Sequence, residues 1–498
     1  MVKFKSKNVS IRAGTFYVAV FHLDDAKLLD LWPTDRVELK KGGKDITAIV
    51  DIAKGEEFVK PGTIALYYET SQKLKTKPSD TVEVLPMPIP AAVRMIKQKL
   101  EGKRLGYRQM HEIIKAISEN DLTDTEMTYF LSASYLRGLS LAEVENLTKA
   151  MVATGDILKP KKKPVFDKHC IGGIPGNRTT PLIVSIVAAA GLCIPKTSSR
   201  SITSPAGTAD TMEVLCNVTV PLEKMKKIVD RVGACIVWGG ALNLAPADDN
   251  IIKIEHPMSL DAEGNLLASI LAKKLSVSST KILIDIPVAR DAKITTTKRA
   301  NRLKKKFYAI AKHFGLDIKV IITDGSQPIG NGIGPALEAR DILWCLTGYH
   351  RAPLDLIKKS VWMSGLLLEM GGKAKPGQGT AKATEILNSG AAYRKFCEML
   401  YAQGAKITDP DKIQLGKFTR VFRAGKSGRI TDVDNKKINP LARMLGAPVD
   451  KGAGIYLYKN EEQSVKKGEK LFKIYANSRR KFNYGVRFLK KYNPYTIK

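Results

Sequence analysis

Two segments within residues 167–213 are rich in glycine and hydroxyl side chains, the residues that commonly surround a bound oxyanion. The first segment follows Lys168 and His169, and its glycines are Gly172, Gly173 and Gly176. Glycine lets backbone N–H groups come close to a ligand, and an adjacent lysine supplies positive charge. This segment therefore predicts a phosphate site.

The second segment places hydroxyl groups around a single arginine, Arg200. The hydroxyl residues are Thr197, Ser198, Ser199, Ser201, Thr203, Ser204 and Thr208. Hydroxyls, free N–H groups and a guanidinium together can hold an oxyanion. Either cluster alone is more often an ordinary turn, so the inference depends on both occurring beside one apolar run. Neither segment has the Gly-Lys-Ser/Thr sequence of a P-loop.

A third group lies in the segment 259–274. Ser269 and Lys273 are four residues apart, which places them on one face of a predicted helix. Asp261 precedes them near the expected start of that helix. An aspartate in such a position most often only stabilises the positive end of the helix.

These motifs resemble those of a known enzyme family. D-K-H-x-x-G-G followed by S-x-R-x-x-x-x-x-x-G-T-x-D-x-x-E is similar to the thymidine and pyrimidine-nucleoside phosphorylases. The longer K-T-S-S-R-x-I-T-S-x-x-G-T-A-D resembles the archaeal branch of this family, the AMP phosphorylases. The resemblance covers the chain from about residue 87 onward. Cys170 departs from it, because the family usually has serine there.

The resemblance implies phosphorolysis of AMP, and of CMP and UMP, to free base and ribose 1,5-bisphosphate. It implies that Asp261 donates the proton to the leaving base and that Ser269 and Lys273 bind the base. No cofactor or metal is implied, since inorganic phosphate is itself a substrate. The residues implied to bind AMP and phosphate are Lys168, His169, Gly173, Ser198, Ser199, Arg200, Ser201, Ile202, Thr203, Ser204, Thr208, Ser269, Lys273 and Lys293.

The chemistry of phosphorolysis suits these parts. In the transition state the sugar resembles an oxocarbenium ion, and phosphate itself is the nucleophile. No enzyme residue therefore has to form a covalent bond with the sugar. A nucleoside monophosphate needs two anion sites, which the two hydroxyl-rich segments and Arg200 can supply. Asp261 must be protonated to act as an acid, so we expect burial to raise its pKa.

Three alternatives remain open. A thymidine or uridine phosphorylase is the first, although the arginine that holds the pyrimidine in thymidine phosphorylases falls near Ile254, where there is none. A phosphoribosyltransferase of related architecture is the second, and it would need Mg²⁺ and pyrophosphate-binding acids. The third is an RNA-binding protein, suggested only by the net charge of +32.

Composition gives a broad class. The chain has 498 residues, of which 44% are hydrophobic and 26% charged, typical of a globular protein of several domains. Its basic residues are spread along the chain, with clusters at 159–163, 304–306 and 479–498. The cysteines form no C-x-x-C pair and the N-terminus lacks a signal-peptide core, which favours the cytoplasm. We expect small-molecule substrates, no membrane, no nucleic acid, and a homo-oligomer built from dimers.

These functional residues must be positioned by a multidomain α/β fold. We expect a small β-barrel at 1–86, a helical domain at 87–162 to which the chain returns at about 250–278, an α/β domain at 163–417 across a cleft, and a C-terminal α+β domain at 418–498. Alternating apolar residues and Gly or Pro turns indicate the barrel. Residues 159–164 are the expected hinge.

Within these domains the pattern predicts individual elements. Capping boxes at Thr123-x-x-Glu126 and Ser140-x-x-Glu143 predict helix starts. The apolar run within 181–195 predicts a buried helix, and 298–314 predicts a basic amphipathic one. Strands are expected at 234–237, 281–286 and 318–322. In the C-terminal domain, 439–457 is expected to consist of strands and turns.

Overall fold

The computed structural model describes residues 1–14, 16–201, 204–255, 262–290 and 292–498. Ile202, Thr203 and Asp261 lie outside the described residues. The chain forms two compact units: Met1–Thr154 with Ala245–Ser269, and Gly155–Leu244 with Ile270–Lys498. Among the described residues, no helix combines the length and apolar character needed to cross a bilayer.

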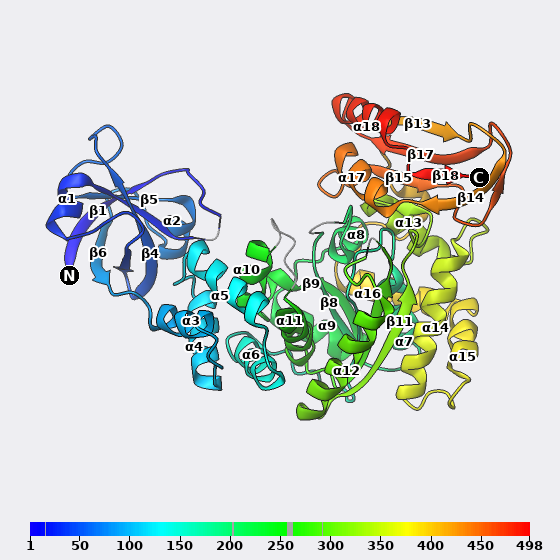
Figure 1. Cartoon of the computed structure of the whole chain (residues 1–498), viewed down its shortest axis with the longest axis horizontal. Helices are drawn as coiled ribbons and strands as arrows, with labels where there is room; N and C mark the ends of the chain where they lie inside the picture. The colour runs from blue at the N-terminus through cyan, green and yellow to red at the C-terminus, as the bar shows by residue number, and fades with distance from the viewer. Residues whose placement is uncertain (15, 202–203, 256–261, 291) are drawn as a thin grey trace. The chain divides into compact units, whose positions relative to one another are not determined.

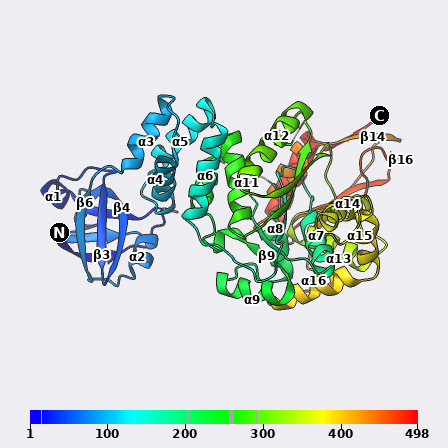
Figure 2. The ribbon, with the colours of Figure 1, turned by 90° about the horizontal axis from the view of Figure 1, so that it is seen from below.

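The first unit begins with the expected closed barrel, whose strand order is β1-β5-β2-β4-β3-β6 (Figure 1). Its strands are β1 Val2–Asn8, β2 Val18–His22, β3 Arg36–Lys41, β4 Lys44–Ala53, β5 Thr63–Leu66 and β6 Thr81–Met87. Its helices are α1 Leu23–Leu28 and α2 Tyr68–Leu74. Figure 2 shows β3 beside its antiparallel neighbours β4 and β6. Alternate residues of each strand fill the interior, where Phe4 and Phe21 meet edge to face.

Helices form the rest of the first unit. They are α3 Ala91–Leu100, α4 Tyr107–Ser118, α5 Asp124–Arg137, α6 Leu141–Ala153 and α10 Pro246–Glu255, and α11 Glu263–Leu275 begins there. Both predicted capping boxes are confirmed, because Glu126 and Glu143 accept the backbone N–H groups of Thr123 and Ser140. Glu143 also accepts a hydrogen bond from the buried Lys99 at 2.7 Å, which joins α6 to α3.

Parallel strands form the centre of the second unit, and the predicted strands are confirmed. They are β7 Phe166–Cys170, β8 Ile194–Ser198, β9 Ala234–Trp238, β10 Lys281–Val288 and β11 Asp317–Asp324. The sheet β11-β10-β7 is parallel throughout, as is the pair β8-β9. A parallel bridge between Val165 and Cys193 brings β7 next to β8.

Helices cover these strands and complete the largest apolar core. They are α7 Thr179–Ala189, α8 Thr208–Leu215, α9 Leu222–Val232, α12 Thr297–His313, α13 Pro335–Thr347, α14 Leu354–Met370, α15 Gly379–Asn388 and α16 Ala391–Ala402, with single 3₁₀ turns at Gly239–Ala241 and Pro410–Lys412. The helix predicted within 181–195 is right only in its first part. α7 ends at Ala189, and Gly191 follows with φ of +83°, a conformation that reverses the chain into β8.

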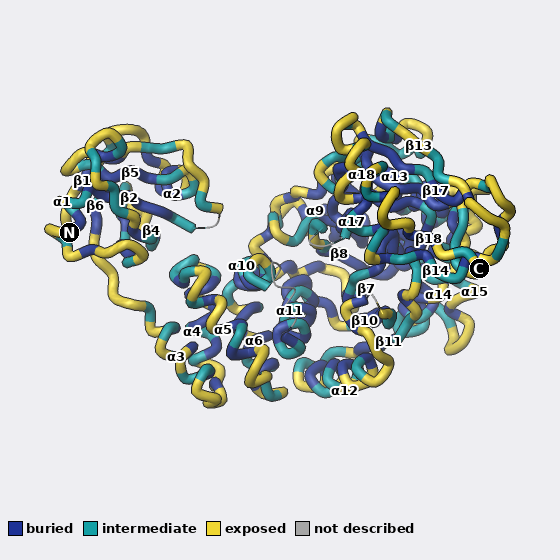
Figure 3. Tube along the Cα trace, turned by 45° about the horizontal axis from the view of Figure 1, so that its top comes forward, coloured by how far each residue is buried: buried dark blue, intermediate teal, exposed yellow. Residues whose placement is uncertain are grey.

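The C-terminal α+β domain belongs to the second unit. Its elements are β12 Gly332–Ile333, β13 Phe418–Arg423, β14 Gly428–Val433, α17 Asn435–Leu445, β15 Gly454–Leu457, β16 Ser464–Val465, β17 Lys470–Ala476, α18 Arg479–Lys491 and β18 Tyr495–Ile497. The sheets have the orders β12-β15-β17-β13 and β16-β14-β18. Figure 3 shows the largely exposed surface of α18.

The prediction of strands and turns in 439–457 is wrong at its beginning, where α17 forms. Ile438, Leu441, Ala442 and Leu445 recur at helical spacing, and all four are buried. Asp434 caps the helix by accepting the backbone N–H of Lys436. Pro440 lies inside this helix, where it has no N–H to donate the usual i→i−4 hydrogen bond to the carbonyl of Lys436, so burial of the four apolar side chains must offset that cost.

Candidate active site

Loops that follow β7, β8 and β10 carry most of the predicted site residues. Because these strands are parallel, the loops leave from the same edge, where ligands of α/β proteins usually bind. A Cβ on Gly173 would lie 3.3 Å from the backbone N of Lys293, and one on Gly176 would lie 2.4 Å from the carbonyl of Ile329. Both glycines therefore admit a neighbouring loop, while the Cβ position of Gly172 has no heavy atom within 4 Å.

A buried cluster of charges lies beneath the first loop. Asp167 is fully buried, and its carboxylate contacts Lys274 Nζ at 2.5 Å and Lys196 Nζ at 3.3 Å. Lys168 is also buried, and its ammonium donates to Thr179 Oγ1 at 2.9 Å. Burial lowers the pKa of Lys168, and it lowers that of Lys274 to about 7. Lys274 and Lys196 thus share the carboxylate of Asp167, and with Lys168 close by in the chain, a nearby anion would be attracted by the excess of cationic groups.

His169 and Cys170 end the strand that leads into the first loop. Burial, together with the charges of Lys274 and Lys196, holds the pKa of His169 well below its usual range. Burial raises the pKa of the Cys170 thiol to about 11, and Asn177 donates to its sulfur at 3.6 Å. At neutral pH both side chains are therefore uncharged, and each can offer a hydrogen without adding charge.

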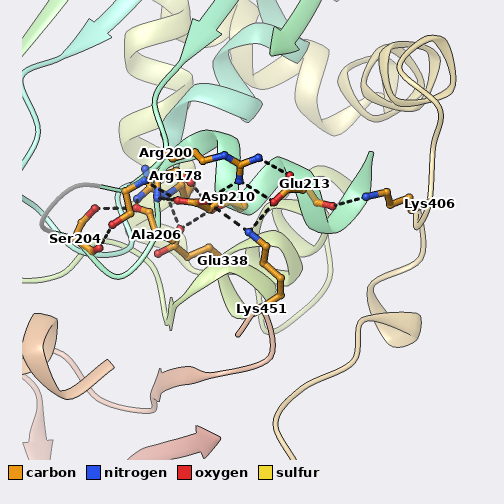
Figure 4. A network of polar contacts seen from close by, with 12 residues as sticks. Arg178, Arg200, Ser204, Ala206, Asp210, Glu213, Glu338, Lys406 and Lys451 are labelled. Atoms are coloured by element: carbon orange, nitrogen blue, oxygen red, sulfur yellow. Dashed lines mark hydrogen bonds and ion pairs between the residues drawn. The ribbon is translucent and has the colours of Figure 1, made fainter. Parts of the chain in front are cut away.

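Arg200 of the second loop pairs with two carboxylates of α8 (Figure 4). Its Nη2 lies 2.6 Å from Glu213, and its Nη1 contacts both Glu213 at 2.8 Å and Asp210 at 3.1 Å. The guanidinium also lies 4.7 Å from the ring centre of Trp238. Lys451 of the C-terminal domain reaches Glu213 at 2.8 Å. These cations, Arg200 first, lower the pKa of Glu213 to about 2.

Asp210 holds the second loop through its backbone. Its Oδ2 accepts the N–H groups of Ser201 at 2.7 Å and Gly207 at 2.9 Å, closing the loop onto the start of α8. Arg200 therefore acts in this conformation as a partner of the carboxylates that shape the loop. All three residues belong to the family motif, in which only Arg200 is a predicted site residue, and the structure joins Arg200, Asp210 and Glu213 in one network.

Several predicted hydroxyl groups donate hydrogen bonds to backbone carbonyls of the loop or of the neighbouring strand β9. Ser198 Oγ donates to the carbonyl of Val237 at 3.2 Å, Ser204 Oγ donates to that of Ala206 at 2.9 Å, and Ser201 Oγ donates to that of Ser204. A hydroxyl that donates to a carbonyl keeps its own oxygen as an acceptor. For any of these hydroxyls to donate to an anion, it must first rotate away from its present partner.

Arg178 is a site residue that the sequence analysis missed. It donates to Glu338 of α13 and to the carbonyl of Ala206, and its Nη1 lies 3.4 Å from Thr208 Oγ1. The first loop is thereby tied to the second. Arg178 precedes the apolar run in the same glycine-rich segment, but Glu338 lies 160 residues away in sequence. Nothing local indicates that pairing.

The remaining predicted residues lie on α11 and in the loop after β10. One helix contains both Ser269 and Lys273, as their spacing predicts, although the boundary between the two units falls between them. Lys293 follows β10, where its backbone packs against Gly173. Asp261 lies outside the described residues, so its role as proton donor stays a prediction.

Family models match three parts of the chain. Residues 93–155 match the helical bundle domain of a glycosyl transferase family, and 162–393 match the α/β domain of that family. Residues 429–496 match the C-terminal domain of pyrimidine nucleoside phosphorylases.

Similar proteins match nearly the whole chain. A protein of Thermococcus kodakarensis named AMP phosphorylase is 43% identical, over 97% of this chain and 95% of the relative. One of Pyrococcus furiosus with the same name is 42% identical, over 99% and 97%. A putative thymidine phosphorylase of Legionella pneumophila is 41% identical, over 91% and 87%.

A solved structure shares the fold of the larger part. The anthranilate phosphoribosyltransferase of Thermus thermophilus superposes with a TM-score of 0.52 at 18% identity, over 62% of this chain and 99% of its own. With relatives of 42% and 43% identity spanning almost the full length of both sequences, the chain belongs to the family of AMP phosphorylases and putative thymidine phosphorylases, enzymes of the pentosyltransferase class.

Proposed function

We propose that the protein catalyses the phosphorolysis of AMP to adenine and ribose 1,5-bisphosphate, and that CMP and UMP are further substrates. The observation that carries the proposal is the pair of loops after β7 and β8, which leave from the same sheet edge and are joined through Arg178. One loop lies above an excess of buried lysines, and the other is rich in hydroxyls. Such a pair suits two anions, the attacking phosphate and the 5′-phosphate.

The names of the relatives support the same reaction. Relatives named AMP phosphorylase match at 42% and 43% identity, including the segment with Arg200. Relatives named putative thymidine phosphorylase match at 41% and 43%, so a nucleoside phosphorylase is the second candidate. The two candidates differ in whether the 5′-phosphate is needed.

In the proposed reaction an oxygen of phosphate forms a bond to C1′ of the ribose as the bond from C1′ to the base nitrogen breaks. The base takes the electron pair of that bond and a proton from Asp261, and it leaves as neutral adenine. Asp261 remains as a carboxylate until solvent returns the proton. The buried Lys168 and the neutral His169 and Cys170 would orient the attacking phosphate. Ser269, Lys273 and Lys293 would hold the nucleotide.

The decisive measurement is kcat/KM for AMP and for adenosine at the same phosphate concentration, following free adenine. We expect AMP to be favoured by roughly ten- to a hundredfold, the value of one lost charge-assisted contact. Thymidine and uridine are assayed alongside. Equal kcat/KM for AMP and adenosine, or release of thymine from thymidine faster than release of adenine from AMP, would favour a nucleoside phosphorylase instead.

We also propose that the protein acts in the cytoplasm as a homo-oligomer built from dimers, as in the family that it resembles. The cysteines support a reducing compartment, since all six are free thiols and four are buried in the core.

A further inference from the structure

A cavity of about 730 Å³ opens in the second unit at a distance in sequence from all the loops described above. Its walls come from the end of α13, from the loop 348–354 that follows, and from β15 and β17 of the C-terminal domain. None of its lining residues belongs to the loops after β7, β8 or β10. Its volume is within the range of cavities that hold small organic ligands.

Aromatic rings form a large part of the lining. Tyr456 lies edge to face with both Trp344, at 6.3 Å between ring centres, and Tyr458, at 5.1 Å. Tyr458 is 38% exposed, whereas Trp344 and Tyr456 are buried. His350 and Tyr475 also line the cavity. Rings that pack together at one edge and remain open at another offer a surface on which a planar base can stack.

Positive charge surrounds these rings. The guanidinium of Arg340 lies 4.4 Å from the ring centre of Trp344, and Lys470 Nζ lies 5.8 Å from that of Tyr458. Arg351 adds a third cation to the lining. The carboxylate of Asp355 accepts the backbone N–H groups of Gly330 and Leu356, which take up part of its charge. The cavity is therefore suited to an aromatic ligand that carries negative charge.

Two buried polar atoms in the lining lack a hydrogen-bond partner among the described residues: Arg340 Nε and the amide oxygen of Asn460. A buried polar atom without a partner costs free energy, and such atoms often mark the place of a ligand or water. One of these atoms is a cationic donor and the other is an acceptor. Both atoms are covered from solvent, so a ligand in the cavity reaches either one only after its side chain has shifted.

We propose that this cavity is a second binding site, separate from the active site, for a nucleotide. The base stacks on Tyr458, while Arg351 and Lys470 bind the phosphate. The nucleotide can be a free monophosphate or the end of a single-stranded RNA. The segment 470–498, of which Lys470 and Tyr475 line the cavity, contains nine lysines and arginines and no acidic residue, which suits the longer ligand as well. This proposal does not depend on the reaction at the active site.

Photolabelling of the full chain with 8-azido-AMP tests the site directly, because cross-linked peptides are identified by mass spectrometry. We expect label on the peptide that carries Tyr456 and Tyr458. The variant Arg351→Gln/Lys470→Gln should lose that label by about tenfold or more, since two charge-assisted contacts are removed. The matched control is Arg487→Gln/Lys490→Gln, which removes two exposed charges from α18 and should keep the label. Neither pair belongs to the proposed active site.

Competition shows whether the site prefers a free nucleotide or the end of an RNA strand. AMP or a 5′-phosphorylated hexaadenylate is added before irradiation, and the competitor that prevents labelling at the lower concentration is the preferred ligand. Tyr458→Phe should keep the label and Tyr458→Ala should reduce it, since stacking requires the ring. Label found only on peptides of other segments would overturn the proposal. Equal loss of label in Arg351→Gln/Lys470→Gln and in the α18 control would also overturn it.

Discussion

At the residue scale, Arg200 shows how a motif can be recognised while its role stays open. The motif suggested a guanidinium that binds phosphate, yet two of its nitrogen atoms contact Asp210 and Glu213. Asp210 in turn holds the N–H groups of Ser201 and Gly207. The contacts favour a role in which Arg200 positions the loop.

Two variants separate direct binding from positioning. If Arg200 positions the loop, both Arg200→Ala and Glu213→Gln should lower kcat/KM for AMP, because each breaks the same network. If Arg200 binds phosphate, Glu213→Gln should instead lower the KM for AMP or phosphate by releasing the guanidinium. We expect the first pattern, with losses of roughly tenfold for Glu213→Gln. Lys406→Gln, which removes a contact only to the backbone of Glu213, is the control.

Asp261 is the second residue whose role can be measured. Protonation of the leaving base by a positioned acid typically contributes roughly 10²–10⁴-fold. Asp261→Asn keeps the shape and the hydrogen bonds of the side chain but cannot donate a proton in the same way. We expect kcat for AMP to fall by about two orders of magnitude with little change in KM. Near-normal turnover in this variant would assign Asp261 to helix stabilisation alone.

At the scale of elements, α13 anchors the loops around the site. Glu338 at its start binds Arg178, and Asp341 one turn later accepts the N–H groups of Asn331 and Gly332 from the glycine-rich segment 325–334. The carboxylate of Asp341 is 1% exposed, and burial raises its pKa to about 7. This segment is thus a structural support held by a carboxyl group.

The pKa of Asp341 predicts a pH effect on stability. Its pKa in the folded state lies above the ordinary aspartate value of 3.8, so the folded state binds the proton more tightly than the unfolded state. The stability from this group is therefore complete below about pH 4 and is lost as the pH rises through about 7. Asp341→Asn stays neutral, and we expect its Tm relative to wild type to be higher at about pH 8 than at about pH 5. The exposed Asp317→Asn provides the baseline, and a pH-independent difference would contradict the assignment.

At the scale of the whole molecule, positive charge is the most unusual property. The net charge of +32 attracts anionic substrates, and buried lysines near the first loop add a local excess. Lysine and arginine can balance the charges of phosphate groups without a metal. Among the described residues, no group of three or more histidine, cysteine or acidic side chains is arranged to bind a metal ion.

Metal dependence therefore distinguishes the proposed reaction from that of a phosphoribosyltransferase. We expect the rate of adenine release from AMP to be unchanged after treatment with EDTA, because cationic side chains neutralise both phosphates. A parallel sample with added Mg²⁺ is the control. Loss of activity in EDTA that Mg²⁺ restores would favour the phosphoribosyltransferase.

Local patterns in the sequence determined much of this protein. Alternation defined the barrel strands, Thr123 and Ser140 marked helix starts, and the buried strands were recognised from short apolar runs. Each of these patterns depends on interactions between residues a few positions apart, so a single segment of sequence contains the whole signal. The two loops and their motif residues were found for the same reason. The predicted boundaries failed at the end of α7, which stops before Gly191, and at α17, which forms where strands and turns were expected.

Only the tertiary structure decided how these parts are used. Arg178 pairs with Glu338 across 160 residues, and Lys274 and Lys196 converge on Asp167 from separate elements. Whether a carboxylate stays charged, as Glu213 does, or keeps its proton near neutral pH, as Asp341 does, depends on burial and on partners brought together by folding. Sequence spacing carries no information about such distant neighbours, because desolvation and pairing arise only when the chain packs.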